Sequence, residues 1–418
     1  MGLEKPLAFG AAVMTNSTLL TRVALKNYKS LAACDVRFGP LAFLVGPNGA
    51  GKSNFLDALR FVTDSLRTSL EHALRDRGGI NEVRRRSGGH PNHFGLRLWF
   101  SLPSGEVGYY AFRIGARPQG GFEVQSEECK VHAPEALGEV QYFRVESGSV
   151  VESTQPGPVA VSDRLYLVSA SGLTPFRPVY EALSRMGFYS LNPDRIRDLQ
   201  SPDAGELLAR DGSNITSVLA QLKKNSRNRK LRIEEYLSKV VPGVQGVDVK
   251  VVGPKETLEF RQQVAGSKDP WRFLAANMSD GTVRALGILV ALFQSGNGAG
   301  PRVPLVGIEE PEIALHPAAA RLLLDGLREA SRSTQVIVTS HSPDLLDDED
   351  LDARSILAVY SEKGSTHIAP LDQTGRTALL KRLYTPGELL RMGQLRPDPD
   401  FAPEKVAKQL RLLDNERN

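Results

Sequence analysis

The chain of 418 residues has few of the residue types that would place it in several common classes of protein. Its two cysteines, Cys34 and Cys129, lie far apart with no CxxC partner, so the sequence predicts neither a disulfide framework nor a cysteine metal site. We expect both thiols to be reduced, as in a cytoplasmic protein. No apolar run approaches the roughly eighteen residues that cross a membrane. The sequence also contains no internal repeat, low-complexity tract or sustained heptad pattern.

The N-terminal residues and the net charge give weaker indications. Residues 1–17 include an apolar stretch, but only Lys5 precedes it and no clear cleavage pattern follows, so we interpret it as a loosely ordered tail and not as a signal peptide. The net charge of +4 permits contact with nucleic acid without requiring it. Charge alone therefore selects no function.

A glycine-rich loop between an expected strand and an expected helix is the most informative stretch. The loop runs through Gly46, Pro47, Asn48, Gly49, Ala50, Gly51, Lys52, Ser53 and Asn54. Glycines let successive N–H groups turn toward one anion at a helix N-terminus. In such a loop the lysine reaches the β- and γ-phosphates and the serine hydroxyl binds Mg²⁺. The sequence therefore predicts a site for a nucleotide and magnesium.

The pattern of apolar residues predicts an α/β protein built from two ATPase lobes and an insertion. Short alternating runs from about residue 94 to 151 indicate an antiparallel meander. Strands alternate with helices again from residue 271, which indicates a mostly parallel sheet covered by helices. We predict an N-terminal lobe over 18–172, a lid of helices and a β-hairpin over 173–269, a second ATPase lobe over 270–375, and a helical tail over 376–418.

Two carboxylates follow an apolar strand at residues 305–308. Glu309 and Glu310 appear where that strand ends, and ligands of open α/β folds bind at this edge of the sheet. Glu309 is placed to hold Mg²⁺, directly or through water, and Glu310 to orient or deprotonate an attacking water. In isolation a solvated acidic turn is the commoner explanation, but beside a phosphate loop the functional interpretation is favoured.

Two further polar groups stand where a phosphate-binding site could use them. Ser279 or Asp280 can cap the helix that begins near Val283, and Gly281 leaves the backbone N–H groups there open. His341 follows the apolar strand at residues 335–339, where a contact with a γ-phosphate is plausible. Each also has an ordinary structural explanation, as a plain capped helix or a hydrogen-bonded histidine.

In this order, the motifs resemble those of the ATP-binding-cassette branch of P-loop ATPases, in particular the RecF/SMC-like and OLD-like ATPases of bacteria. The matching stretches are LKNYKSL, GPNGAGKSN as Walker A, NMSDGT as the signature motif, LVGIEEPE as Walker B, EIALHP as the D-loop and VTSHSP as the switch-histidine loop. The resemblance is specific for residues 19–60 and 270–345 and loose between them.

The resemblance implies an ABC-ATPase-like P-loop core with a mixed sheet, an antiparallel β subdomain and a helical lid. It also implies a head-to-tail homodimer or higher homo-oligomer, in which Ser279 and Gly281 of one copy close over the ATP of another. Lys52, Glu310 and His341 would be the catalytic residues. Two departures stand out: the family usually has Asp where this chain has Glu309, and no clear Q-loop glutamine is visible, Gln141 being only a weak candidate.

Several other stretches carry less specific signals. The acidic cluster 347–352 is more typical of a charged turn than of a Toprim nuclease site, so we expect any nuclease to be a separate protein. A zinc site at His90–His93 lacks further ligands. Solvated surface is the commoner explanation for the basic stretches Arg84–Arg86 and Lys223–Arg232, although either could meet nucleic-acid phosphates. Residues 383–395 resemble the tail of the same ATPase family, and a helix docked on the core is the simplest interpretation.

Two functions from different classes remain open. One is an ATPase that works as a switch or motor on DNA, or for an effector or nuclease partner, in DNA repair or anti-phage defence. The other is an ATP-gated scaffold that assembles an effector complex with little turnover. An ATPase subunit of a membrane transporter is a weaker alternative, because the long lid and tail differ from such subunits.

Overall fold

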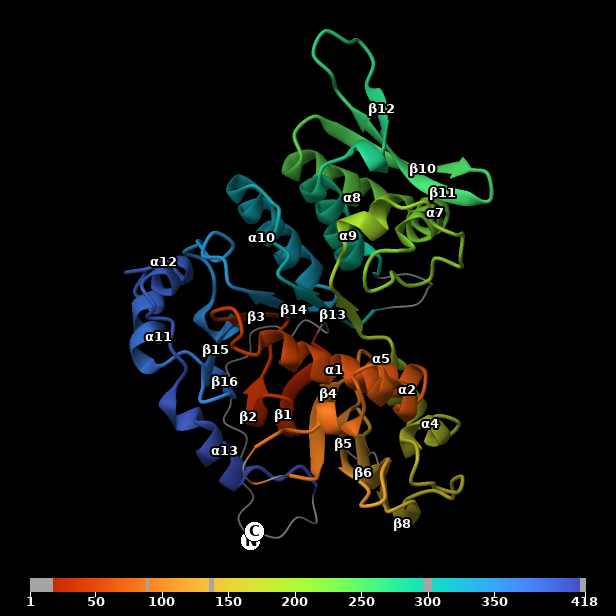
Figure 1. The fold of residues 1–418 in the computed structure, drawn as a ribbon, viewed down its shortest axis with the longest axis vertical. Coiled ribbons are helices and arrows are strands. Elements are labelled where there is room, and N and C mark those ends of the chain that lie inside the picture. The colour runs from red at the N-terminus through yellow and green to blue at the C-terminus, as the bar shows by residue number, and fades with distance from the viewer. Residues whose placement is uncertain (1–17, 88, 90, 135–138, 296–302, 414–418) are drawn as a thin grey trace.

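The computed structural model describes residues 18–87, 89, 91–134, 139–295 and 303–413. The expected N-terminal tail at 1–17 and His90 of the expected histidine pair lie outside these ranges. One mixed sheet of 13 strands runs through the described chain, in the order β8-β7-β6-β5-β4-β1-β2-β16-β15-β3-β14-β13-β9. Figure 1 shows the meander below this sheet's centre, the lid above it and the C-terminal helices at one side. The expected mixed α/β fold is confirmed.

The centre of the sheet is parallel and buried on both faces. Its strands are β3 (Leu41–Val45), β9 (Gly187–Tyr189), β13 (Leu305–Glu309), β14 (Gln335–Ser340) and β15 (Ile356–Glu362). Val45 is paired with Ser340, and Glu309 with Thr339, so the carboxyl ends of these strands lie at one edge. The loop after β3, the acidic turn after β13 and the histidine after β14 therefore meet at this edge.

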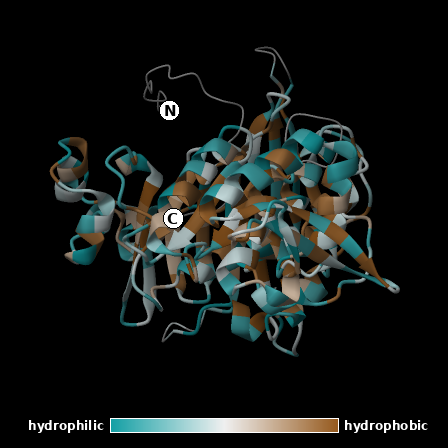
Figure 2. Ribbon diagram, turned by 90° about the horizontal axis from the view of Figure 1, so that it is seen from above, coloured by the Kyte–Doolittle hydropathy of each residue, from teal (hydrophilic) through white to brown (hydrophobic). Residues whose placement is uncertain are grey.

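Alternate residues of β3 face two different cores. Leu44 packs with the apolar side of helix α1 (Lys52–Arg67), whereas Phe43 and Val45 pack with helices α9 (Asp280–Phe293) and α10 (Pro317–Ser331) on the other face. Such two-sided burial requires continuous apolar strands. In Figure 2 the apolar colour accordingly gathers on the interior strands, and the outer helices carry polar faces.

The antiparallel meander extends the sheet on the N-terminal side. It contains β1 (Leu20–Tyr28), β2 (Leu31–Arg37), β4 (His93–Ser101), β5 (Val107–Ala116), β6 (Phe122–His132), β7 (Gln141–Glu146) and β8 (Ser149–Ser153). Cys34 and Cys129 lie in these strands as buried free thiols, and burial raises the pKa of both.

The helix after the phosphate loop is shorter than its apolar spacing suggests. The sequence predicts helical spacing through residue 74, but α1 ends at Arg67, and α2 (Leu70–Arg75) and α3 (Ile80–Val83) follow as separate helices. The side chain of Ser69 accepts a hydrogen bond from the backbone N–H of His72 and so caps α2. The cap starts a new helix because the backbone of Ser69 is extended.

The lid stands above the sheet in Figure 1 and has its own small sheet. Its chain and the approach to it contain α4 (Tyr166–Ala170), α5 (Arg177–Ser184), α6 (Pro193–Arg197), α7 (Ile215–Asn225), α8 (Arg227–Val240), β10 (Val244–Val252), β11 (Lys255–Gln262), β12 (Trp271–Leu274) and the 3₁₀ helix η1 (Ala275–Asn277). Two strands fall on the other side of the domain boundaries predicted at residues 173 and 269. β9 joins the main sheet, whereas β12 pairs with β11 in the lid.

The C-terminal elements return to the core. They are η2 (Ala353–Ser355), β16 (Ser365–Pro370), α11 (Gln373–Leu380), α12 (Pro386–Arg391), η3 (Pro399–Phe401) and α13 (Pro403–Gln409). Arg391 pairs with Asp344 and Asp347 of the loop after β14, and a Cβ on Gly387 would come within 2.5 Å of the Pro343 carbonyl oxygen. The tail is thus docked on the switch-histidine loop. Among the described helices, none is long and apolar enough to cross a membrane.

Candidate functional site

The phosphate loop needs its glycines for conformation and for space. Gly49 has φ +76° and Gly51 φ +99°, values that disfavour residues with a Cβ. A Cβ on Gly51 would lie 2.0 Å from Thr366 Oγ1, and one on Gly46 would lie 1.9 Å from the Val359 carbonyl oxygen. The loop is therefore packed closely against β15 and β16. Its path requires glycine, because only a residue without a Cβ fits these positions.

Lys52 begins α1 and turns back over the loop. Its ammonium donates hydrogen bonds to the carbonyl oxygens of Gly46 (2.8 Å) and Pro47 (3.0 Å), and the residue is only 4% exposed. Burial lowers the pKa of Lys52, while the nearby carboxylates of Glu310 and Glu312 oppose that shift. The lysine thus lies near the acidic turn after β13.

A hydrogen-bonded chain behind the loop was not predicted from the sequence. Asn54 Nδ2 donates to Ser30 Oγ at 2.7 Å, and that hydroxyl lies 2.7 Å from Thr366 Oγ1. The chain joins the first turn of α1 to the β1–β2 turn and to β16. It fixes the helix end that would face a nucleotide.

The acidic turn brings its second carboxylate to the histidine. Glu310 has φ +44°, a conformation uncommon for a residue with a side chain, and its N–H donates to the Thr339 carbonyl oxygen at 3.0 Å. Glu310 Oε1 then lies 3.2 Å from His341 Nδ1, a buried nitrogen that makes no hydrogen bond within the described chain. The first carboxylate points elsewhere: Glu309 Oε1 lies 3.3 Å from Arg210 Nη2. The two neighbouring glutamates therefore have different surroundings.

Glu312 is a member of the site that the sequence analysis missed. Its Oε1 accepts hydrogen bonds from Ser340 Oγ at 2.7 Å and from the His341 N–H at 3.3 Å. Its Oε2 is buried without a hydrogen-bond partner within the described chain. Such an orphan carboxylate oxygen is costly unless a ligand or water satisfies it. The only sequence signal was its position two residues after Glu310, behind Pro311.

Arg284 connects the expected signature helix to this turn. From α9 it donates to the carbonyl oxygens of Leu191 (3.2 Å) and Glu310 (3.1 Å). Leu191 follows β9, whose carboxyl end shares the edge of the site. Gln141 is instead on β7, near the far end of the sheet from β3, so it is excluded as the Q-loop residue.

The expected signature residues form a capped helix end. Ser279 Oγ accepts the Thr282 N–H at 3.3 Å, so Ser279, and not Asp280, is the cap. Gly281 packs so closely that a Cβ would lie 2.5 Å from the Ala314 carbonyl oxygen. Helix α9 packs in the core on the opposite face of the main sheet from α1, the helix that follows the phosphate loop (Figure 1).

The site offers oxygen donors that suit magnesium. Ser53 is exposed on the first turn of α1, and Glu309 is partly exposed at the end of β13. Within the described residues no cluster of three or more His, Cys, Asp or Glu side chains could hold a metal. Magnesium commonly takes one or two protein oxygens and completes its shell with phosphates and water. The pair fits that pattern if Arg210 releases Glu309.

The acidic cluster after the switch loop is used in ion pairs. Asp348 pairs with Arg328, and Asp350 with Arg382. The cluster is therefore a charged docking turn, close to the simpler of the two interpretations of the sequence.

The basic stretches are also largely engaged within the chain. Lys230 pairs with Glu234 at 2.7 Å, Arg232 pairs with Glu329, and Arg85 donates to the Ser30 carbonyl oxygen at 2.7 Å. Side chains that already have partners offer little charge to nucleic-acid phosphates. These contacts favour the structural explanation of both stretches.

The fold and the loop define a P-loop ATPase of the RecF/SMC/OLD type. The chain belongs to the family described as "AAA domain, putative AbiEii toxin, Type IV TA system", whose model matches residues 41–114 and 178–347. The recognition made from the motifs is thereby confirmed.

Individual relatives are more distant. An OLD nuclease of Thermus scotoductus is 24% identical over 348 residues, which cover 78% of this chain and 59% of the relative, so the chain spans less than two thirds of that protein's length. The RecF protein of Porphyromonas gingivalis is 48% identical over 46 residues, covering 11% of this chain and 13% of RecF. A crystal structure of an Smc head bound to the C-winged helix domain of ScpA superposes with a TM-score of 0.53 at 16% identity, covering 85% of this chain and 99% of that one. This likeness shows the shared fold.

Proposed function

We propose that the protein binds and hydrolyses ATP, and that it works as a nucleotide-dependent switch formed by two copies of the chain. One observation carries the proposal: Glu310 lies 3.2 Å from His341 at the sheet edge that also carries the phosphate loop and the buried Lys52. A base, a polar partner that orients it and a phosphate-binding lysine are the parts that phosphoryl transfer to water requires.

Each residue has a distinct task in this proposal. The N–H groups of residues 49–53 and the ammonium of Lys52 bind the phosphates. Ser53 and Glu309 hold magnesium, which when bound neutralises phosphate charge. Glu310 accepts the proton of the attacking water, and His341 keeps the Glu310 carboxylate in position and contacts the γ-phosphate. Glu312 holds the backbone of the switch loop through the His341 N–H.

A lysine variant tests the enzyme assignment directly. Purified wild-type chain should release phosphate from ATP with magnesium, and Lys52→Ala should lose at least roughly tenfold of that rate, because a buried phosphate ligand is removed. Glu349→Gln, which changes an exposed carboxylate outside the site, should leave the rate unchanged. No turnover by the wild type, or full turnover by Lys52→Ala, would refute hydrolysis at this loop.

The dimer is supported by the packing of α9 on the opposite face of the sheet from α1 and by the resemblance to ATP-binding cassettes. Glu310→Gln should bind ATP without cleaving it and should accumulate as a dimer in light scattering. If Glu310→Gln stays monomeric with saturating ATP, the dimer proposal loses its support. A dimer that forms without measurable turnover by the wild type would instead favour the ATP-gated scaffold.

Mixing two inactive variants tests whether each site uses both copies. Lys52→Ala inactivates the phosphate loop, and Ser279→Arg blocks the signature helix. In a head-to-tail heterodimer of these two chains, one composite site combines the intact loop of one with the intact helix of the other. We expect the mixture to regain about a quarter of the wild-type rate if half of the dimers are mixed. Additive, near-zero rates would show that the signature helix does not complete a partner's site.

We further propose that the switch serves DNA or an effector or nuclease partner. This rests on the relatives, among which RecF is named as a DNA replication and repair protein and the Smc head is bound to ScpA. A mobility shift of labelled DNA that requires ATP and weakens with salt would support DNA as the target. ATP-dependent assembly with no DNA effect would point to a protein partner.

A further inference from the structure

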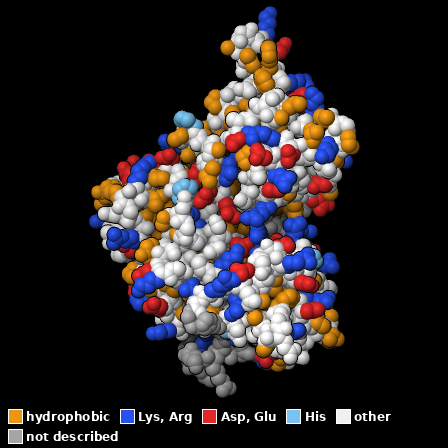
Figure 3. All heavy atoms as spheres, viewed as in Figure 1, with side chains coloured by type: hydrophobic (Ala, Val, Ile, Leu, Met, Phe, Trp, Pro, Cys, Tyr) orange, Lys and Arg blue, Asp and Glu red, His pale blue; other side chains and the backbone are white. Residues whose placement is uncertain are grey.

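A pocket opens at the outer edge of the main sheet, away from the phosphate loop. β9 is the last strand and pairs only with β13 among the described strands, so its other side faces a cavity of about 380 Å³. Met186, Phe188, Tyr189 and Leu208 form a buried floor, and the last half of α1 forms the wall above it. In Figure 3 the right-hand side of the molecule is hollowed between the two lobes, with basic side chains on both sides.

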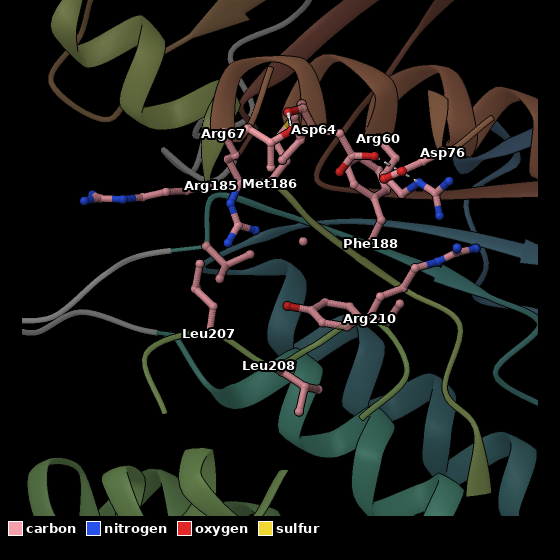
Figure 4. Close-up of a pocket in the computed structure, with 15 residues that line it drawn as sticks. Arg60, Asp64, Arg67, Asp76, Arg185, Met186, Phe188, Leu207, Leu208 and Arg210 are labelled. Atoms are coloured by element: carbon pink, nitrogen blue, oxygen red, sulfur yellow. Dashed lines mark hydrogen bonds and ion pairs between the residues drawn. The ribbon is translucent and has the colours of Figure 1, made fainter. Parts of the chain in front are cut away.

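Four arginines and two aspartates line this pocket, namely Arg60, Arg67, Arg185, Arg210, Asp64 and Asp76. Arg60 and Arg67 come from α1, and Arg210 comes from the loop after α6 (Figure 4). Burial lowers the pKa of Arg60, and the charges of Arg77 and Arg210 lower it further against the opposing effect of Asp57 and Asp64. The two aspartates offset part of the positive charge, and the excess that remains favours an anionic ligand.

The hydrogen-bonding capacity of these arginines is not filled. Arg60 uses Nη2 for Asp57 at 2.7 Å, but its Nε is buried without a hydrogen-bond partner in the described chain. Asp64 stands 3.6 Å from that nitrogen. Arg67 forms no ion pair with any described residue, and Figure 4 shows its guanidinium pointing into the cavity. A buried N–H of this kind is normally satisfied by an acceptor.

We propose that this pocket binds a phosphorylated small molecule of nucleotide size, at a site separate from the phosphate loop. The phosphate accepts hydrogen bonds from the Arg67 guanidinium, which points into the cavity in Figure 4, since guanidinium groups match phosphate oxygens in geometry and charge. The flat part of the ligand lies on Phe188 and Leu208. The volume falls in the range of small-molecule sites, about 300–1,000 Å³.

The pocket also reaches the ATPase site through one side chain. Arg210 lines the cavity and at the same time holds Glu309 Oε1 at 3.3 Å. A ligand that also contacts the Arg210 guanidinium competes with Glu309 for it, so binding of such a ligand frees the carboxylate that we assign to magnesium. This step rests on the proposed function, and by linkage any such effect must be reciprocal.

Titration calorimetry with AMP and with inorganic phosphate tests the site without ATP turnover. The chain carries Lys52→Ala to weaken binding at the phosphate loop. AMP should bind, and should bind at least fivefold more tightly than phosphate. Adding Arg67→Ala should weaken AMP binding at least tenfold, and Arg67→Lys should recover part of it. Arg177→Ala, on α5 outside the pocket, should change the affinity less than twofold.

Two results would overturn the proposal. One is an absence of AMP binding to the Lys52→Ala chain at millimolar concentrations, and the other is equal AMP affinity with and without Arg67. Phosphate binding as tightly as AMP would refute the nucleotide-sized ligand. Because the assay needs no hydrolysis, a wild type that fails to cleave ATP but binds AMP through Arg67 would refute the proposed function and leave this site standing.

Discussion

A buried glutamate in the meander makes the stability of the chain depend on pH. Glu127 on β6 is 0% exposed, and it accepts hydrogen bonds from the Tyr166 and Leu167 N–H groups at the start of α4 and from the Tyr110 hydroxyl. Burial raises the pKa of Glu127 from 4.5 to about 7, against the effect of these donors. The neutral carboxyl is therefore the form that the fold favours.

The sign and size of the effect follow from proton linkage. Because the folded chain binds this proton more tightly than the unfolded chain, the stabilisation is complete below pH 4.5 and is lost as pH rises through 7. With these pKa values of 4.5 and about 7, the free energy of unfolding should fall by about 2.5 kcal/mol between pH 5 and pH 8 through Glu127 alone.

Urea unfolding at pH 5 and pH 8 measures this difference. Trp99 on β4 reports the meander, and Trp271→Phe removes the signal of the other tryptophan, which lies in the lid. Glu127→Gln cannot titrate, so wild type minus variant should shrink by about 2.5 kcal/mol from pH 5 to pH 8. Glu139→Gln, at an exposed position, should follow the wild type. Parallel pH curves for the wild type and Glu127→Gln would show that this carboxyl does not titrate in the predicted window.

Four substitutions, three near the nucleotide site and one in the tail, have different expected outcomes. Gly51→Ala should abolish ATP binding in calorimetry, because its Cβ would lie 2.0 Å from Thr366 Oγ1, whereas Gly49→Ala meets no atom within 4 Å and should bind more weakly without losing ATP entirely. Glu312→Gln keeps an acceptor for the switch loop but removes its charge, so phosphate release should slow roughly tenfold with an unchanged circular dichroism spectrum. Gly387→Ala should lift the tail from the switch loop and speed its cleavage by trypsin, and an unchanged cleavage pattern would contradict the docking.

The sequence was most informative where local chemistry alone determines structure. Gly49 and Gly51 are needed for backbone reasons, and the apolar run before Gly46 is typical of a strand buried on both faces. That Glu310 and His341 lie at the same edge of the sheet could be predicted because each follows directly after an apolar strand. These features could be predicted because each depends on a few neighbouring residues.

Other features depend on contacts between distant residues and gave no local signal. Arg210 meets Glu309 from 99 positions away in the sequence. Glu312 becomes a site residue because burial removes its water and leaves one oxygen unsatisfied. The break between α1 and α2 had a local sign, the capping Ser69, but the apolar spacing continues across it and outweighed that sign.

The charged groups of the site are already partnered by the protein, and this shapes how a nucleotide can bind. Lys52 donates to two loop carbonyl oxygens, and Arg210 holds Glu309. Lys52 is buried, so its hydrogen bonds satisfy a charge that would otherwise be costly, whereas Arg210 and Glu309 are partly exposed and their ion pair contributes little. When a nucleotide with magnesium binds, Lys52 and Glu309 must break these contacts within the protein and form new ones with the phosphate and the metal. Only the difference in free energy between the old and the new contacts contributes to affinity. Arg210 is released by that exchange, and its other surroundings are the arginine-lined pocket. The affinity of Glu309 for magnesium should therefore depend on whether the Arg210 guanidinium finds another acceptor in the pocket.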